Sequence, residues 1–296
     1  MLFQKVIIGG KMDRLDFHIH TNASDGSWNS EETVKNVKEA GLKYFAISDH
    51  DSISNVKLTE YIANKEGLNF IRATEICSKS FDKEIHILGY DIDIDDIDLT
   101  YTMTKTRRVR QNRDTRIIKW VEKNYDNGVS LEEYNIYKMK EMAGLPIMNY
   151  LAQKGVCEGV EPFNEVKAQV PVPKDEDLIS SEEVIKVIKN AGGVAVLAHP
   201  SYYYPGNVMS EEMLNYYLDI GIDGLECYSS YNPLKEQNKY YFEYCKKNDL
   251  IVSGGSDCHG SVYKTRFAGT PIVNLSDTNL LARTRSYKHL QNNPCF

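Results

Sequence analysis

No segment of this 296-residue sequence is apolar for long enough to cross a membrane. Its longest apolar runs are about six residues, whereas a spanning helix needs roughly 20. The N-terminus also lacks the apolar stretch of a secretory signal peptide. The six cysteines include no Cys-x-x-Cys pair, which indicates reduced thiols and argues against a disulfide framework. We therefore expect a cytoplasmic protein without a membrane partner.

An excess of positive charge and the Gly-x-Ser-x-Gly motif of a serine nucleophile are also missing. The net charge of −7 disfavours broad nucleic-acid binding, and no protein nucleophile is expected. One basic stretch covers 105–116, where Arg107, Arg110 and Arg113 recur every three residues and share a helix face. That face is either solvated or binds phosphate. We expect Arg110 and Arg113 to contact a substrate phosphate through their guanidinium groups.

Histidine is scarce, and its positions carry the most information. Six of the seven histidines follow a short β-like apolar stretch and are expected at strand C-termini, and only His289 lies in a polar tail. His18 and His20 are two residues apart, so both side chains would point to one face of a strand. Asp257 and His259 repeat this spacing near the other end of the chain. Histidines at strand C-termini are typical of an α/β barrel, whose chemistry gathers at that face.

Strand and helix patterns alternate over most of the chain. Strand-like segments occur at 15–17, 44–47, 69–75, 84–90, 194–198, 223–228 and 250–254. Helical patterns between them favour a mostly parallel sheet or barrel. The segment 98–172 differs because it is charged, helical in pattern and without a convincing strand. We therefore expect an α/β barrel made of residues 1–97 and 173–296, with an all-helical insertion at 98–172 covering the active-site mouth.

Nine side chains in these segments are candidate metal ligands, all of them imidazoles or carboxylates. They are His18, His20, Asp25, His50, Glu75, His86, His199, Asp257 and His259. This nitrogen and oxygen set suits Mn, Fe or Zn and disfavours thiolate chemistry. Nine ligands exceed the three or four that one zinc ion takes from protein. We therefore expect two to three divalent ions, a bridging Glu75, and a metal-bridging hydroxide that attacks a phosphate ester.

These residues lie in motifs that can be quoted in order along the chain. The motifs are Asp-Phe-His-Ile-His-Thr-Asn-Ala-Ser-Asp-Gly (16–26), Ile-Ser-Asp-His-Asp (47–51), Glu75, His-Ile-Leu-Gly-Tyr (86–90), Ala-His-Pro (198–200) and Gly-Ser-Asp-Cys-His-Gly (255–260). Together they resemble the motifs of the PHP (polymerase and histidinol phosphatase) superfamily. Within it, the chain looks most like bacterial phosphoesterases with a helical insertion. That group includes nucleoside 3',5'-bisphosphate phosphatases and 5'→3' exoribonuclease-like enzymes.

The resemblance implies a distorted (β/α)7 barrel of the PHP type with a trinuclear site for Mn, Fe or Zn. By motif match, one ion would be held by His18, His20, Glu75 and Asp257. A second ion would be held by Glu75, His86 and His199. The third would be held by Asp25, His50 and His259.

One segment departs from the pattern of these relatives. Where they usually carry Gly-Arg-Pro-His, this chain has Gly144-Leu145-Pro146-Ile147, so an arginine and a histidine that could contact phosphate or base are absent. We expect a metal-dependent phosphoesterase acting on a phosphomonoester, such as a nucleoside 3',5'-bisphosphate or the 5' end of a short RNA. The alternatives are a histidinol-phosphate-type phosphatase and a non-catalytic metal-binding module. No stable protein partner is expected.

Further polar and aromatic residues close to these motifs have expected roles. Asp49 should point away from its neighbour His50 and support the site without binding metal. Cys77 and Cys258 are expected to pack in the core. Candidates for contact with phosphate or base are Lys264, Arg266, Tyr202, Tyr203 and Tyr204.

Overall fold

The computed structural model describes residues 13–140, 145–171 and 178–286. Its centre is one eight-stranded sheet with the strand order β7-β6-β5-β4-β3-β2-β1-β8. The strands are β1 (Arg14–Ile19), β2 (Tyr44–Ile47), β3 (Asn69–Ser80), β4 (Lys83–Tyr90), β5 (Val194–Leu197), β6 (Gly224–Ser229), β7 (Ile251–Gly255) and β8 (Val273–Asn274). The predicted α/β barrel type is confirmed. The extra strand, β8, was not predicted because two residues leave no apolar pattern.

The sheet curls until β1 and β7 meet, so the barrel is nearly closed. A parallel bridge joins Ile19 to Cys258, just beyond the end of β7. The buried carboxylate of Asp16 strengthens this junction, because it accepts hydrogen bonds from the amides of Ser256 at 2.9 Å and Gly269 at 2.7 Å. The carboxyl end of β1 therefore lies beside the segment that follows β7.

Strands β3 and β4 form an antiparallel hairpin within an otherwise mostly parallel sheet. β3 pairs in parallel with β2 over 69–72 and antiparallel with β4 over 73–80. β4 is also antiparallel to β5. The expectation that six histidines lie at strand C-termini is therefore wrong for His86, which lies inside β4 near its start. Because β4 runs the opposite way, its first half reaches the mouth where the parallel strands end.

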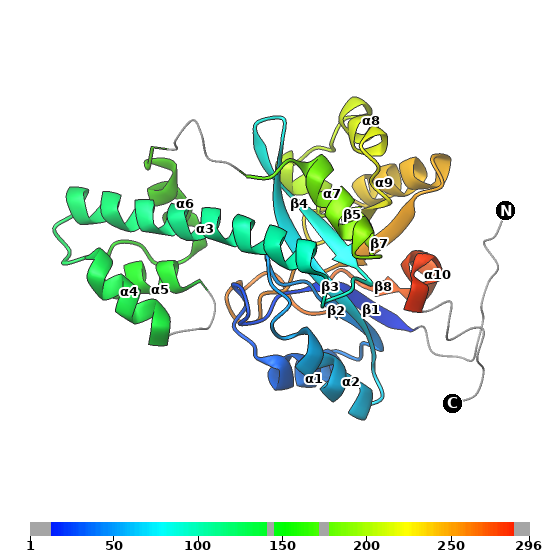
Figure 1. The fold of residues 1–296 in the computed structure, drawn as a ribbon, viewed down its shortest axis with the longest axis horizontal. Helices are drawn as coiled ribbons and strands as arrows, with labels where there is room; N and C mark the ends of the chain where they lie inside the picture. Colours follow the sequence, from blue (N-terminus) through cyan, green and yellow to red (C-terminus); the bar gives the residue numbers. More distant parts are fainter. Residues whose placement is uncertain (1–12, 141–144, 172–177, 287–296) are drawn as a thin grey trace.

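Helices cover the outside of the sheet (Figure 1). They are α1 (Ser30–Glu39), α2 (Val56–Lys65), α7 (Ser181–Asn190), α8 (Glu211–Asp219), α9 (Lys235–Lys247) and α10 (Leu280–Arg283), with 3-10 turns η1 (Pro200–Tyr203) and η2 (Leu275–Asp277). Asn29 and Glu32 form a capping box that begins α1, since each side chain bonds the other's backbone amide. Val34 of α1 and Ile188 of α7 join strand residues in the main apolar core.

The long helix α3 (Ile97–Asn124) leaves the barrel and packs with three further helices at its far end (Figure 1). These are α4 (Leu131–Lys140), α5 (Pro146–Gln153) and α6 (Val160–Ala168). Ile118, Tyr150 and Phe163 belong to an apolar cluster that the four helices share, separate from the barrel core. The expected boundary at 172/173, Gly144 and His289 lie outside the described residues. Within the described part of the chain, no helix is both long and apolar enough to cross a membrane.

The barrel junction leaves no room for a side chain at position 255. A Cβ added to Gly255 would lie 2.6 Å from the backbone nitrogen of His18 and closer still to its Cβ. We predict that Gly255→Ala lowers the free energy of unfolding by about 1–3 kcal/mol or more, because β1 and β7 must separate. Thermal unfolding followed by circular dichroism would measure this. Exposed Glu236→Ala on α9 is the control, and equal melting temperatures for both variants would contradict the prediction.

Candidate metal centre

All nine predicted ligand residues converge on the mouth of the barrel. His18 lies in β1, Glu75 in β3 and His86 in β4. The other six lie in the segments that follow β1, β2, β5 and β7: His20, Asp25, His50, His199, Asp257 and His259. Seven of the nine are buried, while 9% of the His50 side chain and 14% of the His86 side chain are exposed. The site thus has one partly open side, next to His50 and His86.

The carboxylate of Glu75 is the centre of this arrangement. It is completely buried, and both of its oxygens face imidazole nitrogens. The distances to Oε1 are 3.0 Å from His199 Nε2 and 3.2 Å from His86 Nδ1. The distances to Oε2 are 3.1 Å from His50 Nδ1, 3.3 Å from His20 Nε2 and 3.4 Å from His18 Nε2. Five histidines, from four strands or the segments that directly follow them, therefore surround one carboxylate.

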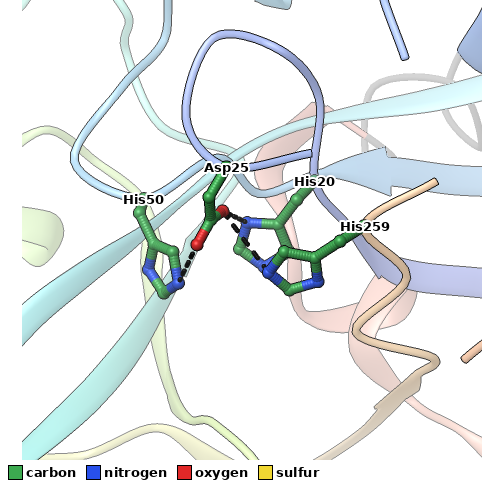
Figure 2. A group of neighbouring side chains, drawn as sticks. All are labelled: His20, Asp25, His50 and His259. Carbon is green, nitrogen blue, oxygen red and sulfur yellow. Dashed lines mark ion pairs between the residues drawn. The ribbon is translucent and has the colours of Figure 1, made fainter. Parts of the chain in front are cut away.

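A second group surrounds Asp25, in the loop after β1. Figure 2 shows its carboxylate between the rings of His20, His50 and His259. Oδ1 lies 3.3 Å from His259 Nε2 and 3.5 Å from His20 Nδ1, and Oδ2 lies 3.6 Å from His50 Nε2. All four ligand atoms lie within 4.8 Å of one another. His20 is an addition to the set of three residues that the motif match implies for this position.

A third group lies on the other side of His20. Asp257 Oδ1 is 3.0 Å from His20 Nε2 and 3.3 Å from His18 Nε2, and Glu75 completes the group. The carboxylate of Asp257 is held by its second oxygen, Oδ2, which accepts hydrogen bonds from the Tyr231 hydroxyl at 2.8 Å and Arg266 Nη1 at 2.6 Å. The orientation of this carboxylate is therefore fixed from the solvent side.

There are two further sets of potential ligand atoms, and within each set the atoms lie within 4.8 Å of one another. One is Glu75 with His86 and His199, as the motif match implies. The other is His50 with Cys77 and His86, although the sequence favours a packing role for Cys77. The signal available in the sequence was the spacing of Glu75 and Cys77, which places both side chains on one face of β3.

Several buried atoms of the site have no hydrogen-bond partner among the described residues. They are Glu75 Oε2 and the Nδ1 atoms of His20, His50, His86 and His199. Buried polar atoms are normally paired, so unpaired imidazole and carboxylate atoms that face one another fit a bound cation. The clusters therefore indicate metal ions, and the donor chemistry of the residues present suits them.

Neighbouring groups shift the pKa values of the site in opposite directions. Burial alone would raise the pKa of Glu75 and Asp257, but the surrounding imidazoles hold both well below their usual range. Burial would lower the pKa of His20, yet its contacts with Asp257 and Glu75 raise it to about 9. Burial, followed by the charge of Arg110, lowers the pKa of His50. The carboxylates are therefore ionised at neutral pH, as metal binding requires.

Supporting residues surround the candidate ligands. Asp49 points away from the site, as expected, and its carboxylate accepts hydrogen bonds from the Thr21 amide at 2.8 Å and the Ser24 hydroxyl at 2.6 Å. These bonds hold the loop that carries Asp25. The sequence analysis did not identify Glu226 of β6, which is fully buried beside His18. A glutamate within a strand gives no local signal that its side chain will reach a distant histidine.

The predicted phosphate-binding residues occupy different places. Arg110 Nη2 is 3.4 Å from Asp25 Oδ2, and Arg113 Nη2 is 2.5 Å from Glu84 Oε2, so both reach the edge of the site from α3. Arg266 contacts Asp257, whereas Lys264 is exposed. Tyr203 is buried, and its hydroxyl accepts a hydrogen bond from the His86 amide at 2.7 Å, while 47% of Tyr202 is exposed beside His199.

The family assignment rests on a sequence comparison. The PHP domain model matches residues 16–230. A 5'-3' exoribonuclease of Haemophilus influenzae is 25% identical over 83% of this chain and 90% of its own. A 3',5'-nucleoside bisphosphate phosphatase of Chromobacterium violaceum is 24% identical over 84% of this chain and 88% of its own. A phosphoribosyl 1,2-cyclic phosphate 1,2-diphosphodiesterase of Eggerthella lenta is 23% identical over 86% and 97%.

Comparison with solved structures agrees with this family match. A Bifidobacterium adolescentis protein described as a metal-dependent phosphoesterase has a TM-score of 0.79 and 27% identity, covering 91% of this chain and 96% of its own. With a domain match over most of its length, the same fold and clusters suited to metal ions, the chain belongs to the PHP domain family and is a metal-dependent phosphoesterase, a hydrolase acting on phosphate esters.

Proposed function

We propose that this chain uses two to three divalent ions, Mn, Fe or Zn, to hydrolyse a phosphomonoester of a nucleotide. The substrates that we favour are a nucleoside 3',5'-bisphosphate and the 5' end of a short RNA, which are the substrate types named for two of its relatives. The observation that supports this most directly is Glu75. A buried carboxylate with five imidazole nitrogens within 3.4 Å has the surroundings that a bridge between ions needs.

The nine residues are proposed to act as ligands in three overlapping groups. They are His18, His20, Glu75 and Asp257; Glu75, His86 and His199; and Asp25, His50 and His259, joined by His20. The two nitrogens of His20 face different groups, because Nε2 lies near Asp257 and Nδ1 lies near Asp25. A neutral imidazole has one free lone pair, so His20 would bind an ion in one group through one nitrogen and donate a hydrogen bond to the carboxylate of the other group through the second.

Ions bound there would supply Lewis acidity and a hydroxide nucleophile at neutral pH, so no side chain needs to attack phosphorus. The side chains of the protein would balance the charge of the ions, exclude water and attract the substrate. Ionised carboxylates hold the positive charge at the mouth, and the surrounding barrel keeps Glu75 away from bulk water. The guanidinium of Arg110, beside Asp25, is placed to attract a substrate phosphate toward the partly open side of the site.

Glu226 is proposed to position two ligands. Its Oε1 lies 2.9 Å from His18 Nδ1, and its Oε2 accepts a hydrogen bond from the His199 amide at 2.8 Å. The first contact fixes the tautomer of His18, so that Nε2 is free to face Glu75 and Asp257. The second fixes the backbone at His199, whose φ of 28° is unusual for a residue with a side chain.

We predict that Glu226→Gln weakens metal binding by about 10- to 100-fold, because the charged partner of His18 is lost. Metal content after dialysis, measured by inductively coupled plasma mass spectrometry, would report this. The matched control is Glu211→Gln on α8, an exposed glutamate paired with Lys247. Equal metal content in the two variants would contradict a positioning role.

A cavity of about 440 Å³ lies between β4 and the helical segment 98–172, which we propose acts as an insertion covering the mouth. Arg113 and Arg116 of α3 and Lys167 of α6 line it, together with Glu84 of β4. Glu84 lies 3.3 Å from His86 Nε2, which connects the cavity to the candidate ligands. Three cations and one carboxylate suit a ligand with negative charge beyond the phosphate that is hydrolysed.

Two further features bear on the substrate. Tyr202 is half-exposed, and its ring centroid lies 4.9 Å from that of Tyr231, so an aromatic surface flanks the site where a base could stack. In the segment that departs from the relatives, Ile147 is buried in the apolar cluster of the helices. Relatives with an arginine and a histidine in this segment could use them to contact phosphate or base. In this chain, we propose that Arg113 and Arg116 of the cavity make such contacts instead.

The proposed activity is tested with purified protein and Mn, Fe or Zn in turn. Phosphate release is measured from adenosine 3',5'-bisphosphate and histidinol phosphate, and release of phosphate or mononucleotides is measured from a short 5'-phosphorylated RNA, with His20→Ala as the inactive control. We predict release from one of the first two substrates, abolished in the control because His20 serves two groups. Preferential hydrolysis of histidinol phosphate would favour the alternative phosphatase. Retained metal without any release would favour a non-catalytic module.

We predict that Arg113→Ala raises the KM for the nucleotide by about tenfold or more, since a charge-assisted hydrogen bond to phosphate is lost. Steady-state kinetics would measure KM and kcat separately. Lys119→Ala, an exposed cation on the same helix, is the control for loss of charge. An unchanged KM with reduced metal content would show that Arg113 acts only by holding Glu84 beside His86.

A further inference from the structure

Cys77 lies on the inner face of the β3–β4 hairpin, within the candidate metal centre. It is completely buried, and it pairs directly across the hairpin with His86. Residues directly opposite in antiparallel strands have neighbouring side chains on the same face. Glu75, two residues earlier, shares that face as well. Burial agrees with the expected packing role, but among the described residues Cys77 is not a member of the three apolar clusters.

The neighbours of the Cys77 thiol are metal-ligand types. Its sulfur and one nitrogen each from His50 and His86 all lie within 4.8 Å of one another. Nδ1 of His50 and Nδ1 of His86 are buried and lie 3.1 and 3.2 Å from the two oxygens of Glu75, in contacts that do not meet hydrogen-bond geometry. The His50 side chain is 9% exposed, so it has little access to water. The thiol and these two imidazoles therefore form a mixed sulfur and nitrogen donor set.

We propose that Cys77, with His50 and His86, forms a thiolate-containing metal position in this centre that takes Zn²⁺, Fe²⁺ or Co²⁺ in preference to Mn²⁺. This inference rests on the proposed metal centre. A bound ion displaces the thiol proton to solvent, and the resulting thiolate is a soft donor. Soft donors select zinc and iron, whereas manganese prefers carboxylate, carbonyl and water oxygens. The proposal thus differs from the expectation, drawn from nine nitrogen and oxygen ligands, that thiolate chemistry is disfavoured here.

The position overlaps with the other groups. His50 also belongs to the Asp25 group, and His86 also belongs to the group of Glu75 and His199. An ion at the thiolate position would compete with those groups for two imidazoles. The identity of the available metal therefore determines whether His50 and His86 bind an ion together with Cys77 or bind ions in the other two groups.

The test is titration of the metal-free protein with Co²⁺, followed by absorption spectroscopy. Visible d–d bands report that cobalt binds to the centre, and a near-ultraviolet sulfur-to-cobalt charge-transfer band reports a thiolate ligand. We expect both in the wild type, loss of only the charge-transfer band in Cys77→Ser, and both again in Cys258→Ser. Cys258 is the matched control because it is a buried thiol between two candidate ligands but belongs to none of the groups within the described residues.

The outcomes separate the two proposals. Visible bands without a charge-transfer band in the wild type would overturn the Cys77 proposal and leave the metal centre standing. Absence of both would overturn the metal centre as well. Competition titrations should show that Cys77→Ser weakens Zn²⁺ binding by about tenfold or more, with little change for Mn²⁺.

A measurement on the unaltered protein covers the case in which Cys77→Ser fails to fold. Zinc-edge X-ray absorption of the wild type should contain a sulfur shell at about 2.3 Å. A spectrum with only nitrogen and oxygen neighbours would overturn the proposal. Circular dichroism of each variant would show whether its fold is intact.

Discussion

The burial of Glu75 is the constraint on which the rest of the site depends. An ionised carboxylate that is taken out of water loses several kcal/mol of hydration unless opposite charge or donors replace it. Five imidazoles replace the lost hydration of Glu75. Their nitrogens reach its two carboxylate oxygens only because the strands that carry them meet at the barrel mouth. In the absence of metal, His18 and His20, whose pKa values are raised by the neighbouring carboxylates, carry part of the compensating charge; with metal, the same imidazoles are available as ligands.

The antiparallel strand β4 explains how nine candidate ligands meet at one place. In a wholly parallel barrel, only the carboxyl end of each strand faces the mouth. Here β3 continues past its parallel partner and turns back as β4, so Glu75 in mid-strand and His86 near a strand start both reach the site. The same hairpin brings Cys77 and Glu84 into range. Closure between β1 and β7, fastened by Asp16, places His18 beside Asp257.

The nine candidate ligands could be predicted because short local motifs mark them, and helix starts such as Asn29 are marked by their capping residues. The features that could not be predicted from the sequence depend on contacts between distant segments. The direction of β4, the second partner of His20 and the reach of Glu226 to His18 all follow from strand pairing across the sheet. The proximity of Cys77 to His50 and His86 follows from strand pairing as well, since the two histidines come from other strands or the segments after them.

The central claim is that Glu75 joins adjacent metal ions, and anomalous X-ray diffraction from crystals of the metal-loaded protein tests it most directly. Data collected at the Mn, Fe and Zn edges would place and identify each ion. We expect at least two anomalous peaks, with both carboxylate oxygens of Glu75 in the coordination shells. A single peak, or peaks that leave Glu75 uncoordinated, would contradict it.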